Sequence, residues 1–441
     1  MHRVNLGIVG GGTVGGGVFQ AIARNGGLMA SRLGVELRVV RVAVQDLAKT
    51  RPVRIPAALL TTDWRSLVDD PAVNLVGEFI GGTTTAREIL LHAFSRGKSV
   101  ITANKALLSA HGEELFAAAQ ANGANLYYEA SVAGGIPIVK VLREGLIGNQ
   151  FTRIYGIVNG TCNYILSRMK LEGAEFADVL ADAQKLGYAE AEPSLDIDGH
   201  DAAHKTGILA SLAHGFWVNP KEIYVEGIRS VSRKDIQFAG QMGYTIKLLG
   251  IVKKSTTAPA GSKRFAPVQV SVYPALVPNT HVLASVNGVF NAILVRGDVV
   301  GDTLYYGRGA GQDATASAVL SDLADAALDL KCGIQNRVPP FVPHERAGAV
   351  TPIGDVVSPY YVRLSVVDKP GTLAAITAIF GRAKIGISSV RQPEGTEGDS
   401  VPLILMIHDA TNADLTKALA KIAKLAAVKA PPIMLRVESF E

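Results

Sequence analysis

The sequence of 441 residues predicts an α/β protein with three parts: a Rossmann-type doubly wound parallel sheet, a second α/β unit and a ferredoxin-like block at the C-terminus. Three observations predict this fold class. Short runs rich in β-branched residues alternate with helical patterns over residues 4–132. From about residue 150 this simple alternation is lost, and residues 360–436 follow the order β-α-β-β-α-β.

The first part begins with a strand at residues 4–9. Val14, Val18 and Ile22 follow at four-residue spacing, which predicts a helix that is ended by the pair Gly26-Gly27. Strands that alternate with helices in this way form a parallel sheet with helices on both faces. The later elements expected here are strands at 35–44, 74–80, 99–103 and 125–132 and helices at 84–96 and 110–121.

The second part is expected to contain strands at 151–158 and 267–276 and helices at 176–186 and 198–214. A further helix is expected at 313–328, and the prolines and glycines of 333–358 predict a linker. The C-terminal block is expected to contain strands at 360–367, 387–392, 401–408 and 433–438 and helices at 373–384 and 413–428.

The composition excludes several classes of protein. Apolar residues make up 48% of the chain and charged residues 19%, which excludes a disordered protein. The two cysteines exclude a disulfide framework and favour a reducing cytoplasm. The net charge of +5 is scattered, with no basic stripe between aromatic residues, so we expect no nucleic-acid partner. No apolar stretch reaches the ~18 residues of a membrane span, so we expect no membrane partner.

A glycine motif follows the first strand. Gly10, Gly12 and Gly15 form G-x-G-x-x-G between this strand and the next helix. In a dinucleotide-binding turn the first glycine allows the tight turn, the second lets the backbone approach a pyrophosphate, and the third allows close helix packing. The motif therefore predicts dinucleotide binding, and the alternative is a purely structural glycine turn.

The end of the second strand bears on the choice between NAD and NADP. An acidic residue at the end of this strand would bind the ribose 2′-hydroxyl of NAD. Gln45 stands near that position, Asp46 comes one residue late, and Lys49 and Arg51 follow. The missing acid and the nearby cations favour the 2′-phosphate of NADP, with NAD as an alternative cofactor. The other interpretation is that Lys49 and Arg51 are simply solvated.

Two further segments could contact a ligand. Lys105 follows a parallel strand, and ligands bind at the carboxyl ends of such strands. The alternative for Lys105 is an exposed lysine in a loop. Gly309 belongs to the glycine-rich segment 307–311, which could form a second backbone cradle or simply cap the following helix.

An acidic segment, GYAEAEPSLDIDGHDAAHK at 187–205, leads into an apolar helix. Asp201 and Lys205 are four residues apart, so they share one helix face. A buried lysine next to carboxylates can serve as a proton donor, whereas the alternative is an ordinary surface ion pair. His200 and His204 imitate a zinc-binding HExxH motif, but we do not expect zinc beside a nucleotide-binding N-terminus.

Together these segments resemble homoserine dehydrogenases, in particular the monofunctional bacterial form with a C-terminal ACT domain. The resemblance covers nearly the whole chain, and its most diagnostic part is the acidic segment at 187–205. DKPGTLAAI at 368–376 is similar to the opening of ACT regulatory domains. The other segments are GIVGGGTVGGGV at 7–18, GGTTTAREIL at 81–90, TANKALL at 102–108, EASVAGGIP at 129–137 and NGTCNYIL at 159–166.

The resemblance implies reduction of aspartate-4-semialdehyde to homoserine with NAD(P)H, the branch step toward threonine, isoleucine and methionine. Lys205 would be the acid–base residue, with Asp201 as its partner and Lys105 near the nicotinamide and the substrate. A lysine ammonium suits the alkoxide that develops when hydride attacks an aldehyde. Implied substrate contacts are Glu190, Tyr188, Thr161 and Asp196, and implied cofactor contacts are Gly12, Thr13, Val14 and Thr83.

The resemblance also implies a cation. The segment from Glu129 resembles the sodium loop of the family, which uses mainly backbone carbonyls, here those of Glu129, Val132, Gly134 and Ile136. One residue departs from the family pattern, because arginine often stands where this chain has Gln45. The loss of that cation weakens the expected preference for NADP.

The resemblance and the element order suggest a division into domains and a form of regulation. We expect the ACT domain to sense an amino acid, most reasonably the end product threonine, and we expect a homodimer or homotetramer. The alternative is that this domain serves assembly alone. The expected domains are 1–145 for dinucleotide binding, 146–305 for catalysis and dimerisation, 306–332 for a returning helix, 333–358 for a linker and 359–441 for ACT.

Two rival functions remain open. The chain could be another Rossmann dehydrogenase that acts on a different amino-acid aldehyde or amine, since Glu190 could hold the amino group of several substrates. It could instead be an amino-acid sensor with a nucleotide fold and no catalysis, although this leaves Lys205 and Asp201 without a role.

Overall fold

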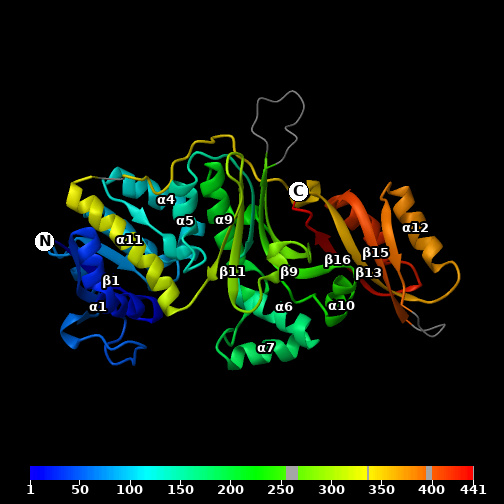
Figure 1. Cartoon of the computed structure of the whole chain (residues 1–441), viewed down its shortest axis with the longest axis horizontal. Helices are drawn as coiled ribbons and strands as arrows, with labels where there is room; N and C mark the ends of the chain where they lie inside the picture. Colours follow the sequence, from blue (N-terminus) through cyan, green and yellow to red (C-terminus); the bar gives the residue numbers. More distant parts are fainter. Residues whose placement is uncertain (255–266, 335–336, 394–399, 441) are drawn as a thin grey trace. The chain divides into compact units, whose positions relative to one another are not determined.

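The structure is a computed structural model that describes residues 1–254, 267–334, 337–393 and 400–440 (Figure 1). The chain forms two compact units, which are described separately below. The first unit comprises Met1–Val158, His204–Lys221 and Asn291–Gly348. The second unit comprises Asn159–Ala203, Glu222–Phe290 and Ala349–Glu441.

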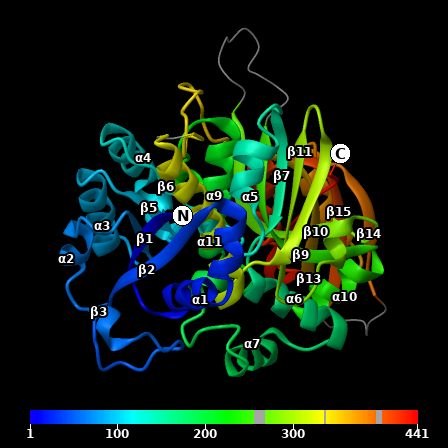
Figure 2. The same ribbon diagram turned by 60° about the vertical axis from the view of Figure 1, so that its left-hand side comes forward.

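The first unit contains the predicted doubly wound parallel sheet, with strand order β3-β2-β1-β4-β5-β6. The order reverses between β1 and β4, which is where a doubly wound sheet opens a crevice for ligands. Helices α1 and α11 cover one face, and α2, α3 and α4 gather on the other (Figure 2). The strands are β1 (His2–Val9), β2 (Val35–Ala43), β3 (Leu60–Thr61), β4 (Leu75–Glu78), β5 (Ser99–Thr102) and β6 (Leu126–Tyr127). The helices are α1 (Thr13–Leu33), α2 (Trp64–Asp69), α3 (Thr84–Ser95), α4 (Lys105–Ala121) and α11 (Gln312–Cys332).

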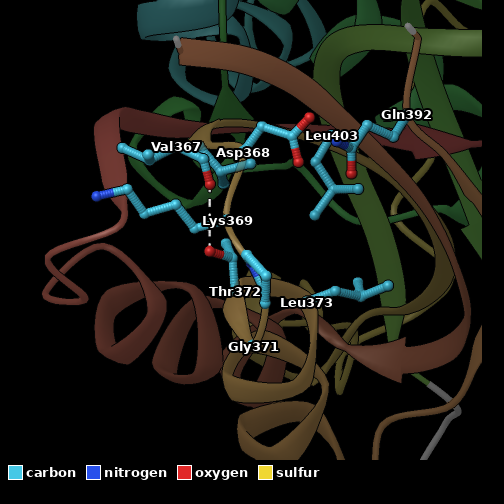
Figure 3. Close-up of a pocket in the computed structure, with 10 residues that line it drawn as sticks. Val367, Asp368, Lys369, Gly371, Thr372, Leu373, Gln392 and Leu403 are labelled. Carbon is cyan, nitrogen blue, oxygen red and sulfur yellow. Dashed lines mark hydrogen bonds between the residues drawn. The ribbon is translucent and has the colours of Figure 1, made fainter. Parts of the chain in front are cut away.

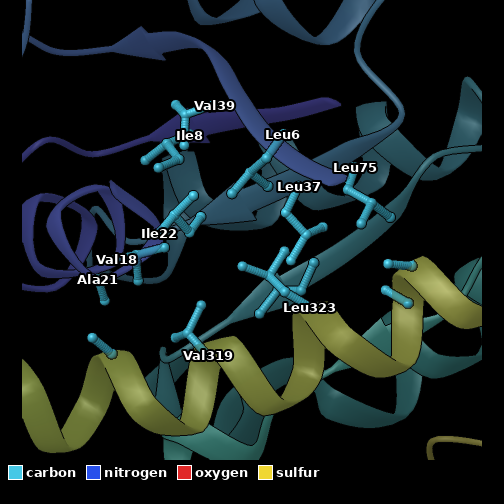
Figure 4. Packing of buried hydrophobic residues seen from close by; sticks show 14 of the residues in the cluster. Leu6, Ile8, Val18, Ala21, Ile22, Leu37, Val39, Leu75, Val319 and Leu323 are labelled. Atoms are coloured by element: carbon cyan, nitrogen blue, oxygen red, sulfur yellow. The ribbon is translucent and has the colours of Figure 1, made fainter. Parts of the chain in front are cut away.

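Helix α1 does not end at Gly26-Gly27, so that expectation was wrong. It continues to Leu33 and ends at Gly34, which has a left-handed backbone with φ of 63° and donates its N–H to the Ala30 carbonyl. Gly26 and Gly27, which lie within the helix, cost it roughly 1 kcal/mol each. The apolar face of α1 packs against α11 and the sheet, which offsets this cost (Figure 4). The core residues at this contact are Val18, Ala21, Ile22, Val319 and Leu323.

Other elements of the first unit also differ from expectation. The strand expected at 125–132 is short, because a 3₁₀ turn follows at Glu129–Ser131. Helix α4 begins at Lys105, five residues before the expected start at 110, because Asn104 caps it by accepting the Leu107 N–H. The remaining elements are α5 (Ile138–Lys140), a π-helical turn (Val141–Gly145), β7 (Phe151–Ile157), β11 (Phe290–Gly297) and β12 (Gly301–Arg308), where β11 pairs antiparallel with β7 and lies next to β12.

Helix α9 (His200–His214) carries the expected Asp201 and Lys205, and the division between the two units falls within it, after Ala203. Before its C-terminal block, the second unit contains short helices and an antiparallel hairpin of β9 and β10. Its elements before residue 279 are α6 (Gly160–Glu172), α7 (Phe176–Lys185), α8 (Ser194–Ile197), β8 (Tyr224–Val225), α10 (Arg233–Gln241), β9 (Tyr244–Lys254) and β10 (Val268–Pro278).

The C-terminal block has the predicted ferredoxin-like order. Its sheet runs β16-β13-β15-β14 with antiparallel neighbours, and the apolar faces of α12 and α13 pack on it through Ile376, Phe380, Leu415 and Ile422. The elements are β13 (Val357–Val367), α12 (Thr372–Arg382), β14 (Ile387–Arg391), β15 (Ser400–Thr411), α13 (Asn412–Ile422) and β16 (Val428–Val437).

Strand β16 also joins the C-terminal block to the hairpin of the same unit. It pairs parallel with β10 at Ala275–Arg436 and Leu276–Val437. The fully buried Arg436 donates to Glu226 at 3.1 Å and to Asn412 at 2.7 Å, and its guanidinium lies 4.4 Å from the Tyr273 ring centre. Strand β16 therefore links the hairpin and the C-terminal strands within one continuous sheet.

Strand β13 makes a second connection within this unit. Arg363 donates from Nε to Asp235 of α10 at 2.6 Å, and the Tyr361 hydroxyl donates to the same carboxylate at 3.0 Å.

Across the described ranges, no helix has the length and apolar character that crossing a membrane requires.

Candidate active site

The turn between β1 and α1 shows why its three glycines differ. Gly10 has φ of 108°, and a Cβ there would lie 2.6 Å from the Phe79 carbonyl oxygen. A Cβ on Gly15 would lie 1.8 Å from the Gly10 carbonyl oxygen. A Cβ on Gly12 would meet nothing within 4 Å, so the backbone there faces open space. Gly10 and Gly15 therefore shape the turn, while Gly12 leaves room for a ligand.

This open space is a cavity of about 950 Å³ in the first unit. It lies at the carboxyl ends of β1, β2 and β4, where three loops meet. The expected cofactor residues among its lining are Gly10, Gly12, Thr13, Lys49, Arg51 and Thr83. Its size and its glycine turn at a helix N-terminus fit a dinucleotide with its pyrophosphate at the start of α1.

The loop after β2 places charged groups at one side of the cavity. Arg51 donates to the Leu47 carbonyl at 3.3 Å and also to the Asp46 carbonyl. The Asp46 carboxylate accepts the Ala48 N–H at 2.8 Å. Gln45, Asp46, Lys49 and Arg51 all line the cavity, so one acid and two cations are available to the ribose end of a cofactor.

The other expected cofactor residues lie outside the lining of this cavity. Val14 packs against the hydrophobic core of the first unit. Gly309 lies against Asn291, and its carbonyl oxygen would be 2.6 Å from a Cβ on Gly134. Lys105 is the first residue of α4, three residues after the end of β5, so it lies in a helix rather than in a loop, and its side chain is partly buried.

Lys205 is buried on α9, with 8% of its surface exposed. Its Nζ donates to the Val158 carbonyl at 2.7 Å, just after the end of β7. Asp201 comes one helical turn earlier and is 5% exposed. The two are therefore not an ordinary pair of solvated surface charges.

Asn159 binds two acidic residues of the second unit, and the sequence did not predict this role. Its Nδ2 donates to Asp196 at 2.7 Å and to Asp201 at 2.9 Å, while its Oδ1 caps α6 by accepting the Cys162 N–H. The Thr161 hydroxyl lies 3.3 Å from Asp196 and donates to the Tyr188 carbonyl at 2.7 Å. An asparagine directly before a helix that begins Gly-Thr is a capping signal that could have identified it.

Tyr188 and Glu190 lie at the exposed side of this cluster. The Tyr188 ring packs at 5.0 Å from the Tyr164 ring and remains 45% exposed. Glu190 is exposed, and its backbone carbonyl accepts from Gln184 at 3.1 Å. All four expected substrate residues thus lie in the second unit around α6, α7 and α8: Thr161, Tyr188, Glu190 and Asp196.

The Glu129 loop in the first unit is buried and tightly bonded. The Glu129 carboxylate accepts the N–H groups of Val139 at 3.0 Å and Lys140 at 2.7 Å, and its own N–H donates to Asp322 at 2.9 Å. Burial raises the pKa of Glu129 to about 7. In the part of the chain that the structure describes, no three His, Cys, Asp or Glu side chains gather to form a metal site. A cation at this loop would therefore need backbone carbonyls, and Ala133 and Gly134 form a left-handed turn there with φ of 54° and 43°.

Comparisons with known proteins agree with this geometry. Family models match residues 10–129 as "Homoserine dehydrogenase, NAD binding domain", 137–324 as "Homoserine dehydrogenase" and 360–427 as "ACT domain". The homoserine dehydrogenase of Pseudomonas aeruginosa is 41% identical over 445 residues, which span 100% of both chains.

Solved structures give the same result. A homoserine dehydrogenase from Thiobacillus denitrificans is 42% identical with a TM-score of 0.92, covering 100% of this chain and 99% of that one. A hyperthermophilic archaeal homoserine dehydrogenase in complex with NADPH is 29% identical with a TM-score of 0.61, covering 74% of this chain and 98% of that one. The chain therefore belongs to the homoserine dehydrogenase family, whose activity is that of an NAD(P)-dependent oxidoreductase acting on a CH–OH group.

Proposed function

We propose that this enzyme reduces L-aspartate-4-semialdehyde to L-homoserine with Lys205 as the proton donor. The observation that carries the proposal is the buried Lys205 ammonium, held by the Val158 carbonyl one helical turn after Asp201. When bound, NAD(P)H supplies a hydride to the aldehyde carbon. Lys205 stabilises the negative charge that develops on the aldehyde oxygen and transfers a proton to it from Nζ, which leaves homoserine and a neutral lysine.

The reverse reaction sets a condition on Lys205. Oxidation of homoserine requires a neutral lysine to accept the hydroxyl proton. Alkaline pH therefore favours oxidation and neutral pH favours reduction. Asp201 is held by Asn159 and precedes Lys205 by one turn of α9.

The substrate carries an amino group and a carboxylate besides its aldehyde. We assign the amino group to the exposed carboxylate of Glu190, with Thr161, Tyr188 and Asp196 as further contacts. Lys105 is assigned to the nicotinamide end of the cofactor and the substrate. Its place at the carboxyl end of β5 supports this assignment, because ligands of doubly wound sheets bind at that edge.

For the cofactor we propose NADP, with NAD as a weaker alternative. Lys49 and Arg51 line the cavity near the end of β2, where a 2′-phosphate would be bound, and Gln45 supplies no charge. The preference is therefore modest, because Asp46 also lines this side of the cavity. Val14, Gly15 and Gly309 act through packing of the turn and its surroundings.

We also propose a monovalent cation, sodium by resemblance, at the carbonyls of Glu129, Val132, Gly134 and Ile136. The left-handed turn at Ala133 and Gly134 supports this, because it redirects the carbonyls of a buried segment. The Glu129 carboxylate already accepts two backbone N–H groups, so we assign the cation to the backbone carbonyls and not to this carboxylate. Replacing sodium with a bulky organic cation in the buffer is expected to lower turnover, and unchanged turnover would contradict the assignment.

The C-terminal domain is proposed as a sensor for threonine. A cavity of about 460 Å³ lies where β13 meets α12, lined by Val366–Leu373 together with Gln392 and Leu403 (Figure 3). Gly371 has φ of 87° and lets the backbone approach a small ligand, and the start of α12 can take a carboxylate. Binding there can inhibit only by favouring one arrangement of the subunits, which fits a homodimer or homotetramer.

A substrate panel with both cofactors tests the function. Purified enzyme is mixed with NADPH or NADH and with aspartate-4-semialdehyde, other amino-acid aldehydes and imines, and cofactor oxidation is followed by absorbance. We expect the highest kcat/KM for aspartate-4-semialdehyde with NADPH. A higher value for another aldehyde or for an imine would identify a different Rossmann dehydrogenase. Amino-acid binding without any turnover would identify a non-catalytic sensor.

A further inference from the structure

Glu78 is a fully buried carboxylate that the proposed mechanism does not use. It is the last residue of β4, directly before the loop that lines the dinucleotide cavity with Ile80, Gly81, Gly82 and Thr83. A buried ionisable group is costly unless its oxygens are hydrogen-bonded. The bonds that Glu78 makes therefore indicate what it holds in place.

The first partner of Glu78 is in the loop itself. Its Oε1 accepts the Ile80 N–H at 2.9 Å. The loop then continues through Gly81 and Gly82, which have φ of 75° and 72°. Two consecutive left-handed glycines give a flexible backbone in the unfolded state, so this conformation needs fixed partners in the folded state. Glu78 supplies one of them at the entry of the loop.

The second partner lies on the neighbouring strand. Thr102 ends β5, is paired in register with Glu78, and donates its hydroxyl to Oε2 at 2.7 Å. The same hydroxyl accepts the Asn104 N–H at 3.0 Å. The side chain of Thr102 therefore connects Glu78 to Asn104, which directly precedes α4.

Asn104 closes the network. Its Nδ2 donates to the Gly82 carbonyl at 2.7 Å, and its Oδ1 accepts the Leu107 N–H at 3.1 Å, which caps α4. Lys105 is the first residue of that helix. One connected set of bonds thus joins the cavity loop at both its ends to the residue that precedes Lys105, and Thr102 and Glu78 are completely buried beneath it.

We propose that Glu78 is a positioning residue, which through Thr102 and Asn104 holds the cofactor-binding loop at 80–83 and the start of α4 with Lys105 in one fixed arrangement. The inference rests on the proposed role of Lys105 for its effect on turnover, but its effect on cofactor binding stands on the cavity alone. Burial raises the pKa of Glu78, and the hydrogen bonds from Thr102 and Ile80 partly offset that rise.

The test uses two substitutions in the full chain. Glu78→Gln replaces one acceptor oxygen with an amide that can only donate, and Thr102→Val removes the hydroxyl but keeps the shape. For each we expect the Kd of NADPH, measured by fluorescence titration, to rise roughly tenfold, and kcat with saturating cofactor to fall by a similar factor. Thr102→Ser keeps the hydroxyl and is expected to restore both values.

Two further measurements separate positioning from a loss of stability. Asn125→Ala removes another buried polar side chain of the same sheet and is the matched control, because Asn125 directly precedes β6 and so lies at the amino end of this strand, away from the cavity. It is expected to lower Tm without changing the Kd of NADPH. If Glu78→Gln lowers kcat through Lys105, then the double variant with Lys105→Ala will be no slower than Lys105→Ala alone.

The outcomes are distinct. A wild-type Kd of NADPH in folded Glu78→Gln and Thr102→Val, or additive losses of kcat with Lys105→Ala, would overturn the positioning role. An equal loss of NADPH binding in Asn125→Ala would indicate that Glu78 only stabilises the fold, and it would also overturn the positioning role. Failure of the proposed function would show itself differently, because the wild-type enzyme would then bind NADPH but leave aspartate-4-semialdehyde unreduced.

Discussion

Two turns of this protein share one local design and differ in what surrounds them. In each, a glycine with positive φ lies between a strand and the next helix: Gly10 lies between β1 and α1 in the first unit, and Gly371 lies between β13 and α12 in the C-terminal domain. The first turn opens onto a cavity of about 950 Å³ and the second onto one of about 460 Å³.

The difference lies in the neighbouring segments. The first turn meets two more loops at the switch point of a parallel sheet, so its cavity is larger and is lined in part by the cations Lys49 and Arg51. The second turn meets Gln392, which follows β14, and Leu403 of β15, as Figure 3 shows, so its cavity suits a small molecule. A glycine turn thus provides backbone access, while the size and chemistry of the ligand are decided elsewhere.

The largest expected effect tests whether proton transfer by Lys205 is independent of ligand binding at the two glycine turns. Lys205→Ala is expected to lower kcat by about 10²–10⁴-fold, because one acid–base group is lost. The Kd of NADPH and the response to threonine should stay unchanged, since Lys205 lies in neither cavity lining. Steady-state kinetics and fluorescence titration measure these values, with the exposed Lys221→Ala as control. Near-wild-type turnover in a folded variant would remove Lys205 from the mechanism.

The second prediction concerns the strand that leads to the C-terminal turn. Asp235→Asn leaves Arg363 without its charge partner and is expected to cost about 3 kcal/mol of unfolding free energy. Burial tends to raise the pKa of Asp235, but hydrogen bonds from Arg363 and Ser232 outweigh it, so the folded-state pKa lies below its ordinary value. The contribution is therefore present above the unfolded pKa of about 4 and is lost as pH falls through the folded pKa.

Urea denaturation of wild type and Asp235→Asn from pH 3 to pH 8 checks this prediction. The two stabilities should differ at pH 7 and converge in acid. The exposed Asp355→Asn serves as control. A constant difference at all pH values would show that the effect comes from lost packing rather than from the ion pair.

The third prediction compares two glycines within the first turn. Gly15→Ala is expected to cost about 2–3 kcal/mol, because its Cβ would be forced against the Gly10 carbonyl. Gly12→Ala should keep the Tm of the wild type but weaken NADPH binding, since its Cβ would enter the open cavity. Thermal melts and fluorescence titration separate the two. Equal Tm values for both variants would contradict the roles assigned to them.

The fourth prediction tests the charged side of the larger cavity. Arg51→Ala is expected to lower kcat/KM with NADPH roughly tenfold, which corresponds to the loss of one exposed phosphate contact. The value with NADH should change little. Arg54→Ala, an exposed arginine nearby, is the matched control. A preference of the wild-type enzyme for NADH would show that Asp46 binds the 2′-hydroxyl instead.

The smallest effect is expected at the second turn. Gly371→Ala forces a side chain into a left-handed backbone, which costs about 1 kcal/mol, but its Cβ would meet nothing within 4 Å. We expect an active enzyme whose inhibition requires several-fold more threonine. Gly381→Ala, within α12 and also in open space, is the control. If millimolar threonine leaves even the wild-type enzyme unaffected, then the sensor proposal fails for threonine.

The sequence predicted what depends on local pattern. The parallel sheet, the glycine turn and the ferredoxin-like block were all predicted, because alternation and turn residues act over short distances. The end of α1 was predicted wrongly at Gly26-Gly27, because α11 packs on that helix from nearly 300 residues away. Packing between distant segments overrode a local preference there.

Parts of the site escaped prediction for a related reason. Asn159 and Glu78 each act by bonding to residues that are distant in sequence, such as Asp201 and Thr102. Glu78 did leave one signal, since it is an acid within the apolar run NLVGEFI. A charge in a run that otherwise forms a buried strand indicates a bonded partner, and Arg436 in IMLRVE follows the same pattern.

Strand β16 has a consequence for synthesis and for engineering. Strand β10 ends at Pro278, yet its partner β16 ends at Val437, almost at the C-terminus. At ribosomal speeds of about 5–20 residues per second, the edge of β10 waits roughly ten to thirty seconds for this partner. Cutting the chain before the C-terminal domain would leave the same edge open permanently, together with Tyr273 and Lys253, which normally contact the buried Glu438. An enzyme insensitive to its effector is therefore better made by substitution in the smaller cavity than by deleting the domain, because deletion uncovers the edge of β10 at Ala275 and Leu276 and so promotes aggregation.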